Sequence, residues 1–248
     1  MAEPQKFANF INGQWKEPQG GNYYPDINPA DYSDIVGYFP LSTKNDVDEA
    51  IQAAHIAFKS WSHMLPAERA KYLEKFAQLL DQEKQRIGEA LCREEGKTIK
   101  EAVGEPARGA VETSFFIGEG QRLEGITMPS DRKGVVSVAT RVPIGVVAAI
   151  SPWNFPFLTP VRKVIPALVF GNTVVFKPAS DTPYCAVLLM ELFEKAGLPP
   201  GVVNLVIGKG SAIGDAISSN PLVKGITFTG STVVGRRINQ LASEHFAK

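Results

Sequence analysis

The stretch from residue 144 to residue 180 constrains the fold most strongly, because two apolar runs enclose a proline-rich loop and a long apolar segment. Residues 144–150 (IGVVAAI) and 173–177 (TVVFK) have the length and composition of buried parallel strands. Residues 159–170 between them are expected to form a helix, which Gly171 and Asn172 end. Ligands in such a unit gather at the carboxyl ends of the strands, so we expect the chemistry near residues 151–155 and 177–180.

The alternation of strand and helix continues through the rest of the chain. Further strands are predicted at residues 202–207 and 225–229, and further helices at residues 183–196, 211–219 and 232–244. This spacing is typical of a parallel sheet with right-handed crossovers. The expected fold class is therefore α/β, with a Rossmann-type parallel sheet and helices on both faces.

The first part of the chain is expected to form a β-rich arm followed by helices. Residues 1–40 are rich in Asn, Gly, Pro and aromatic side chains, and Asn12-Gly13 is typical of a hairpin turn. We expect this arm to pack over a larger body. A helix is predicted over residues 43–62, because Thr43 and Asp46 fit a capping box.

Two more helical segments and a hairpin are predicted before residue 144. One helix, or two in succession, opens at Pro66 and stops at Gly96, and another is expected over residues 101–118. Residues 134–142 (GVVSVATRV) alternate and are rich in valine, which favours a strand. We expect residues 125–143 to form a hairpin that stands apart from the main sheet and pairs with another subunit.

The composition favours a small-molecule partner or another copy of the chain. The 248 residues carry 26 basic and 26 acidic side chains, so no electrostatic footprint for nucleic acid or an anionic membrane is present. Two cysteines, Cys92 and Cys185, in no metal-ligand spacing predict a reduced, cytoplasmic protein without a metal site. The N-terminal sequence lacks the apolar core of a signal peptide, and no apolar run is long enough to span a membrane.

Two glycine-containing turns indicate a dinucleotide site. Gly208, Gly210 and Gly214 follow a predicted strand and open a helix, although one residue too many precedes the last glycine. A tight strand-to-helix turn explains this spacing equally well. Gly230 and Gly235 flank the start of the next helix, whose free N–H groups could bind a pyrophosphate.

Four polar residues on or near the predicted strand-loop-helix unit are candidates for binding or catalysis. Lys177 could bind ribose hydroxyls or a phosphate, or lie on the surface without a role. Asn154 follows Trp153 on a proline-flanked loop, where its amide could donate to a developing oxyanion or only form a turn. Arg162 and Lys163 interrupt an apolar segment, where an arginine could hold a carboxylate or face solvent.

Four motifs together carry a family resemblance. The chain contains SPWNFP, RKVIPALVFGNTVVFKPAS, GLPPGVVNLVIG and FTGSTVVG in this order. They resemble the NAD(P)-dependent aldehyde dehydrogenase superfamily, and the likeness runs from about Phe10, through FINGQW and NPAD, to the last residue. That family oxidises aldehydes to acids with a cysteine nucleophile, a nicotinamide hydride acceptor and a glutamate that activates water.

The resemblance implies roles for individual residues. Asn154 corresponds to the oxyanion-hole amide, and Lys163 to a lysine that is sometimes assigned to proton relay. The residues implied at the cofactor are Ile150, Ser151, Pro152, Trp153, Asn154, Lys177, Ser180, Gly208, Gly214, Phe228, Gly230 and Ser231.

Two departures from the family pattern bear on cofactor and substrate. Members that prefer NAD often carry a glutamate where this chain has Ser180, so NADP is favoured here, with NAD as the alternative. Arg162 replaces a common tryptophan and is similar to the arginine with which semialdehyde dehydrogenases hold a carboxylate. The expected substrate is an acidic aldehyde such as 2-oxoglutarate semialdehyde or succinate semialdehyde.

A third departure is that the chain ends at Lys248, before the positions where the family carries its glutamate and cysteine. Residues 1–124 and 144–248 are therefore expected to form an NAD(P)-binding domain without a catalytic domain, and the complete enzyme to be a homo-oligomer. Such a chain would bind cofactor and would not turn over. The alternative is a non-catalytic cofactor-binding or interaction fragment.

Overall fold

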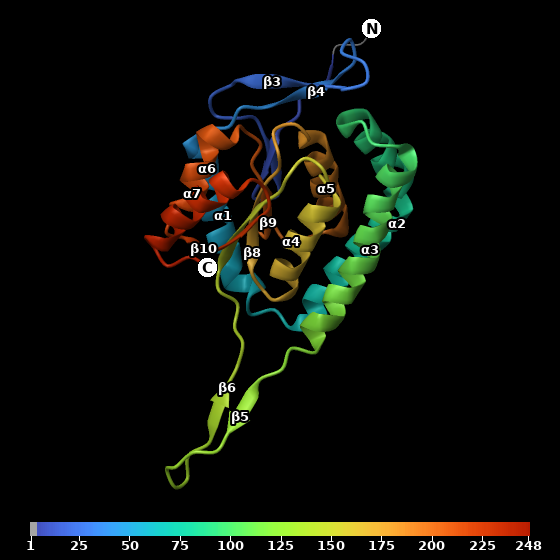
Figure 1. The fold of residues 1–248 in the computed structure, drawn as a ribbon. Helices are drawn as coiled ribbons and strands as arrows, with labels where there is room; N and C mark the ends of the chain where they lie inside the picture. Colours follow the sequence, from blue (N-terminus) through green and yellow to red (C-terminus); the bar gives the residue numbers. More distant parts are fainter. Residues whose placement is uncertain (1–3) are drawn as a thin grey trace.

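A mixed six-stranded sheet forms the centre of the protein in the computed structural model, which describes residues 4–248 (Figure 1). Residues 1–3 of the predicted cofactor domain lie outside the described range. The strand order is β10-β7-β8-β9-β1-β2. The parallel part consists of β7 (Val146–Ile150), β8 (Thr173–Lys177), β9 (Val203–Leu205) and β10 (Val223–Phe228).

The N-terminal arm was expected to pack over a larger body, and its first two strands in addition become part of the main sheet. Strand β1 (Asn9–Ile11) pairs antiparallel with β9 and with β2 (Gln14–Lys16). The predicted turn is confirmed, since Asn12 and Gly13 have φ values of 53° and 73°, and positive φ at both central residues is what a type I′ turn requires. The buried Asn204 side chain accepts the Asn12 N–H at 2.9 Å and fixes the arm to β9.

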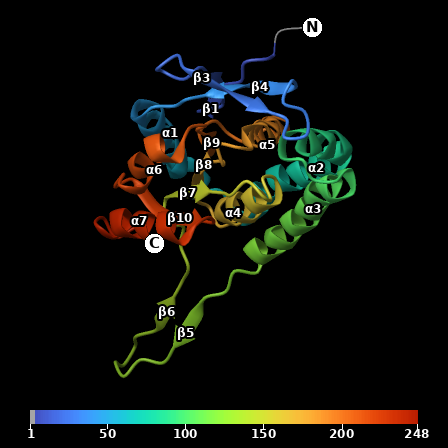
Figure 2. The same ribbon diagram turned by 45° about the horizontal axis from the view of Figure 1, so that its top comes forward.

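Helices cover both faces of the sheet (Figure 2). One face carries α1 (Lys44–Trp61), α6 (Gly210–Ser218) and α7 (Thr232–Ser243), and the other carries α4 (Leu158–Val169) and α5 (Pro183–Ala196). The long helices α2 (Pro66–Glu95) and α3 (Ile99–Gln121) form an outer layer over α4 and α5. Each face has its own apolar core, which confirms the predicted α/β class.

The helix boundaries follow local capping chemistry. The predicted capping box at α1 is confirmed, since the Thr43 N–H donates to the Asp46 carboxylate at 2.7 Å. Helix α2 is a single 30-residue helix that ends at Gly96, whose φ of 85° favours glycine. Helix α3 is longer than the predicted 101–118 and continues through Pro106, because it packs along α2 for most of its length.

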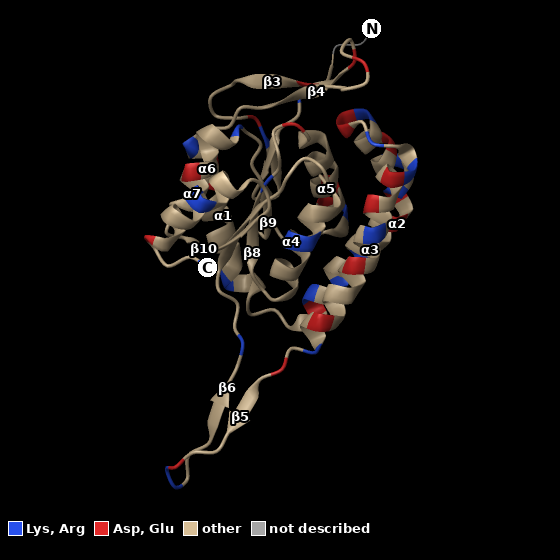
Figure 3. Ribbon diagram, viewed as in Figure 1, with Lys and Arg blue, Asp and Glu red and all other residues tan. Residues whose placement is uncertain are grey.

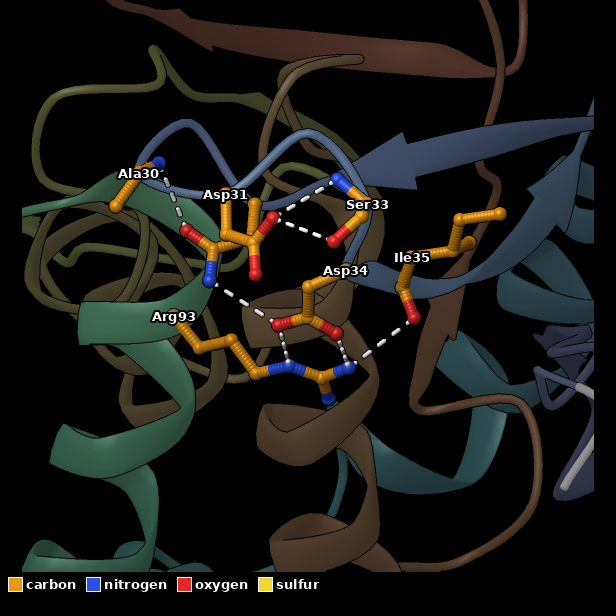
Figure 4. Close-up of polar contacts among 7 residues, drawn as sticks. Ala30, Asp31, Ser33, Asp34, Ile35 and Arg93 are labelled. Carbon is orange, nitrogen blue, oxygen red and sulfur yellow. Dashed lines mark hydrogen bonds and ion pairs between the residues drawn. The ribbon is translucent and has the colours of Figure 1, made fainter. Parts of the chain in front are cut away.

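A second hairpin, β3 (Tyr23–Ile27) and β4 (Ile35–Pro40), lies over the carboxyl ends of the parallel strands (Figure 1). Its turn is attached to α2 by an ion pair, in which Arg93 Nε lies 2.8 Å and Nη2 lies 2.5 Å from the two Asp34 carboxylate oxygens (Figure 4). Arg93 Nη2 also donates to the Ile35 carbonyl at 3.1 Å. The hydrogen bond from Arg93 lowers the pKa of Asp34 to about 2.

The hairpin predicted at residues 125–143 extends away from the rest of the molecule (Figure 1). It consists of β5 (Ile126–Met128) and β6 (Ser137–Ala139), which within residues 4–248 pair only with each other. The strand predicted over residues 134–142 is therefore wrong in length, since no other layer covers its faces and stabilises further pairing. Charged side chains gather at the tip and the base of the hairpin, whereas its paired strands carry none (Figure 3).

Candidate functional site

The candidate site lies where the direction of winding in the sheet reverses. From β7 the chain passes to β8 on one side, whereas β10 lies on the other side. Backbone hydrogen bonds join the strand ends, since the Thr229 N–H donates to the Ile150 carbonyl at 3.1 Å and the Ser151 N–H donates to the Lys177 carbonyl at 3.3 Å. Ligands in open α/β sheets bind at this kind of switch point.

Lys177 and Ser180 follow the end of β8. Lys177 is buried, and its Nζ donates to the Pro178 carbonyl at 2.8 Å. Burial lowers the pKa of Lys177 to about 8, against the opposing effect of Asp181. The Ser180 hydroxyl lies 3.3 Å from the Gly208 carbonyl, and the Ser180 carbonyl accepts the Tyr24 hydroxyl at 2.9 Å. These contacts join β8, the loop before α6 and the N-terminal arm.

The glycines of the two predicted turns have different physical roles. A Cβ on Gly208 would lie 3.0 Å from Ile213 Cδ1, and one on Gly230 would lie 2.6 Å from the Phe228 ring, so a larger residue at either position would require the neighbouring side chain to move. A Cβ on Gly214 would meet nothing within 4 Å, so space is open beside α6. Ser231 caps α7 by accepting the Val234 N–H at 3.4 Å. The turn before α7 therefore presents a helix N-terminus to a ligand.

Two further observations fit a polar ligand at this edge. The buried Ser151 hydroxyl makes no hydrogen bond with any other residue in the described part of the chain. A cavity of about 520 Å³ is lined by Trp153, Ser180 and Lys209, together with residues of the β3–β4 arm. Lys209 was not predicted from the sequence, although its position between Gly208 and Gly210 was a signal that could have identified it.

Asn154 lies on an exposed part of the loop between β7 and α4, beside Pro152 and Trp153. Its backbone carbonyl accepts Lys97 Nζ at 3.1 Å. The buried Glu105 carboxylate accepts the N–H groups of the residues that open α4. Lys97 and Glu105 carry no motif and lie far from Asn154 in the sequence, so no local pattern predicted them.

Arg162 and Lys163, adjacent on α4, point in different directions. Arg162 is exposed, and its Nε and Nη2 atoms each donate to Glu112 of α3 at 2.7 Å. Lys163 is buried, and its Nζ lies 3.1 Å from the Thr227 hydroxyl of β10. Burial lowers the pKa of Lys163. Lys163 therefore reaches the sheet edge, whereas Arg162 faces the outer helix layer.

Neither cysteine has the setting of an activated nucleophile. Cys185 is buried in α5, and burial raises the pKa of its thiol well above the usual range. Cys92 is half-buried in the long helix α2. Within residues 4–248, no group of three or more His, Cys, Asp or Glu side chains is arranged to hold a metal ion. None of the helices described is long and apolar enough to cross a membrane.

Comparisons with known proteins agree with this architecture. The pattern of the "Aldehyde dehydrogenase family" matches residues 15–248. Alpha-ketoglutaric semialdehyde dehydrogenase of Bacillus subtilis is 46% identical over 100% of this chain and 51% of its own length. Succinate-semialdehyde dehydrogenase [NADP(+)] of Escherichia coli is 38% identical over 96% of this chain and 49% of its own.

A solved structure described as an E. coli NADP-dependent enzyme superimposes with a TM-score of 0.96 and 37% identity, over 98% of this chain and 50% of that one. The chain thus spans about half the length of the relatives that it matches. Because the family pattern covers nearly all of the sequence and the fold agrees, this chain belongs to the aldehyde dehydrogenase family.

Proposed function

We propose that this chain binds NADP in preference to NAD, as the cofactor-binding part of an enzyme that oxidises a carboxylate-bearing aldehyde. Ser180 is the observation that carries the cofactor preference, because a hydroxyl stands where a carboxylate would repel a 2′-phosphate. Lys209 lines the same cavity, and Lys177 lies at the adjacent strand end. The carboxylates of Asp26, Glu94, Glu95 and Asp181 also line the cavity and oppose an anion. Burial raises the pKa of Asp26, Glu94 and Glu95 and so favours their neutral forms, and the two lysines must outweigh the negative charge that remains.

The proposed cofactor-binding part comprises residues 1–124 and 144–248. The loops after β7, β8 and β10 would hold the cofactor, with the N-terminus of α7 at the pyrophosphate and Ser151 as a further hydrogen-bond donor. NADP, when bound, supplies the hydride acceptor that the side chains of this chain do not provide. The protein's part is to bind and orient it.

Asn154 and Lys163 are the proposed catalytic groups of this chain. The Asn154 amide would donate to the oxygen on which negative charge develops, as preorganised donors do in water-excluded sites. Lys163 would hold or move a proton beside Thr227, because burial already lowers the pKa of its ammonium.

Arg162 is the proposed group that selects an acidic substrate. A planar guanidinium binds a carboxylate through two parallel hydrogen bonds, which favours an aldehyde with an acid at its far end. The names of two relatives, an alpha-ketoglutaric and a succinate-semialdehyde dehydrogenase, are consistent with such a substrate for this chain.

Calorimetric titration of the purified chain with NADP, and then with NAD, tests the proposal. We expect saturable binding of both, with the lower Kd for NADP. In Ser180→Glu the NADP Kd should rise at least about fivefold relative to NAD, because two charges at 4 Å repel by about 1 to 4 kcal/mol. Ser180→Ala is the matched control and should change the ratio by less than threefold. NADP binding no tighter than NAD binding would refute the preference.

A second candidate function is that of a non-catalytic interaction module built on the β5–β6 hairpin. The observation that favours it is the exposure of the apolar side chains of the hairpin, with Val136 77% and Val138 59% exposed. Exposed apolar groups on free strand edges favour pairing with another chain. Absence of cofactor binding, together with a cooperative melt, would support this function over the first.

A further inference from the structure

The loop that carries Asn154 has few restraints of its own. Trp153, Asn154 and Phe155 are exposed. After β7, regular backbone hydrogen bonds resume at the N-terminal turn of α4, where the Thr159 N–H donates to the Phe155 carbonyl. An amide that stabilises an oxyanion must be held in place before the reaction. The restraint must therefore come from another part of the fold.

That restraint comes from the junction between α2 and α3. Gly96 ends α2 with a left-handed backbone and Thr98 caps α3, which leaves Lys97 alone between the two helices. Lys97 Nζ donates to the Asn154 carbonyl at 3.1 Å and lies 4.5 Å from the centre of the Phe155 ring. One side chain thus contacts two successive residues of the loop.

Glu105 of α3 holds the other side of the loop. One of its oxygens, Oε2, accepts the Phe157 N–H at 3.2 Å and the Leu158 N–H at 3.0 Å, and so caps the N-terminus of α4. Its other oxygen, Oε1, bonds Lys97 Nζ. Lys97 also pairs with Glu95 Oε2 at 2.9 Å, and the Lys97 side chain is only 12% exposed. A chain of contacts therefore runs from Asn154 through Lys97 and Glu105 to the first amides of α4.

We infer that Lys97 and Glu105 are positioning residues that fix the loop between β7 and α4, and so aim the Asn154 amide. The inference rests on the proposed role of Asn154. Without Lys97, Glu95 and Glu105 would lose the cation that pairs with both of their carboxylates, and the Asn154 carbonyl would lose its donor. The loop would then adopt several conformations, and the Asn154 amide would no longer be held in one position.

Amide hydrogen exchange and NMR of the chain test this directly. In the wild type we expect the Phe157 and Leu158 amides to exchange at least 100-fold more slowly than the unstructured chain. In Lys97→Met, which keeps the apolar stem over Phe155, their exchange should accelerate at least tenfold and the side-chain amide signal of Asn154 should shift and broaden. Lys97→Arg, which keeps a donor, should restore most of the protection.

Lys84→Met is the matched control, because Lys84 is a half-buried lysine of α2 that, among residues 4–248, forms an ion pair with Asp81 alone. It should leave the loop signals unchanged. The inference is overturned if Lys97→Met leaves the Asn154 signal and the exchange at Phe157 and Leu158 within twofold of the wild type. If Lys97→Met does not fold, the wild type alone provides a test. The inference is then overturned if the Phe157 and Leu158 amides of the wild type exchange as fast as those of an unstructured chain.

Cofactor binding separates this inference from the proposed function. Suppose that the wild-type chain binds neither NADP nor NAD, but shows slow exchange at Phe157 and Leu158 that is lost in Lys97→Met. This result would refute the cofactor assignment and support the positioning network. If the wild type binds NADP and Lys97→Met has no effect on the loop, the cofactor assignment is supported and the positioning network is refuted.

Discussion

Arg162 and Glu112 form a bidentate ion pair between α4 and α3, in which Nε and Nη2 of the guanidinium each lie 2.7 Å from a carboxylate oxygen. Arg108 donates to the same carboxylate at 2.7 Å. The hydrogen bonds from Arg162 are the main reason that the pKa of Glu112 is lowered to about 2. The pair fixes one edge of the guanidinium, so a substrate carboxylate could use the edge formed by Nη1 and Nη2.

This geometry predicts a substrate-selective effect of Arg162→Leu in an enzyme that contains this chain and a catalytic cysteine. A charge-assisted hydrogen bond contributes about 1.5 to 3 kcal/mol, so KM for succinate semialdehyde should rise about 10- to 100-fold. KM for a neutral aldehyde of similar length should change little. Arg108→Leu is the control and should affect both substrates alike, and an unchanged KM in Arg162→Leu would remove Arg162 from substrate binding.

Lys177 predicts a pH dependence of NADP binding. Because burial lowers the pKa of Lys177 to about 8, the free protein loses this positive charge as the pH rises above 8. A phosphate favours the ammonium, so the NADP Kd should stay constant below pH 8 and rise up to tenfold per pH unit above it. Titrations at pH 7, 8 and 9 measure this. Lys177→Arg, which stays charged, should show a flat profile, and a flat wild-type profile would contradict the assignment.

Asp26 predicts a pH dependence of stability with the opposite sign from a normal surface carboxylate. Burial raises the pKa of Asp26 from 3.8 to about 6, so between these values the folded protein binds more protons than the unfolded chain. Stability is therefore lost as the pH rises through this window. Asp26→Asn removes this titration and also the repulsion by which Asp26 raises the pKa of Glu94, so the Tm of the variant minus that of the wild type should increase from pH 4 to pH 6.

Asp31→Asn in the same arm provides a control for that experiment. Hydrogen bonds from the Ser33 hydroxyl and N–H lower the pKa of Asp31, so its contribution to stability is lost as the pH falls. The Tm of Asp31→Asn minus that of the wild type should stay nearly constant from pH 4 to pH 6, because this range lies above the usual pKa of 3.8 and the Asp31 contribution is lost only below it. If both variants showed the same trend by thermal melting, burial of Asp26 could not be the cause.

The β5–β6 hairpin predicts self-association. Val138→Lys places a charge on strand β6, and a charge on an edge strand opposes pairing between chains. The mass measured by analytical ultracentrifugation should therefore shift towards that of the monomer. Ile56→Lys on α1 is the matched control, since Ile56 and Val138 are both 59% exposed. A wild-type chain that is monomeric at every concentration would refute oligomerisation through the hairpin.

The sequence alone determined the alternation of strands and helices from residue 144 onward, because apolar runs, glycine stops and caps are local signals. Strand β8 and helix α5 have the predicted bounds for this reason. The same signals predicted the turn at Asn12 and Gly13, and the loops at the carboxyl ends of the strands where the candidate site lies. Residues within one motif, such as Lys177 and Ser180, could therefore be assigned to one edge of the sheet from local patterns of residues.

Only the tertiary structure decided which distant side chains meet there. Lys97 contacts Asn154 over 57 residues, Glu112 contacts Arg162 over 50, and Tyr24 contacts Ser180 over 156. The tertiary structure also turned β1 into a member of the main sheet and kept β6 to three residues. These outcomes depend on which surfaces are buried against each other, and burial is a property of the packed layers that no local pattern of residues contains.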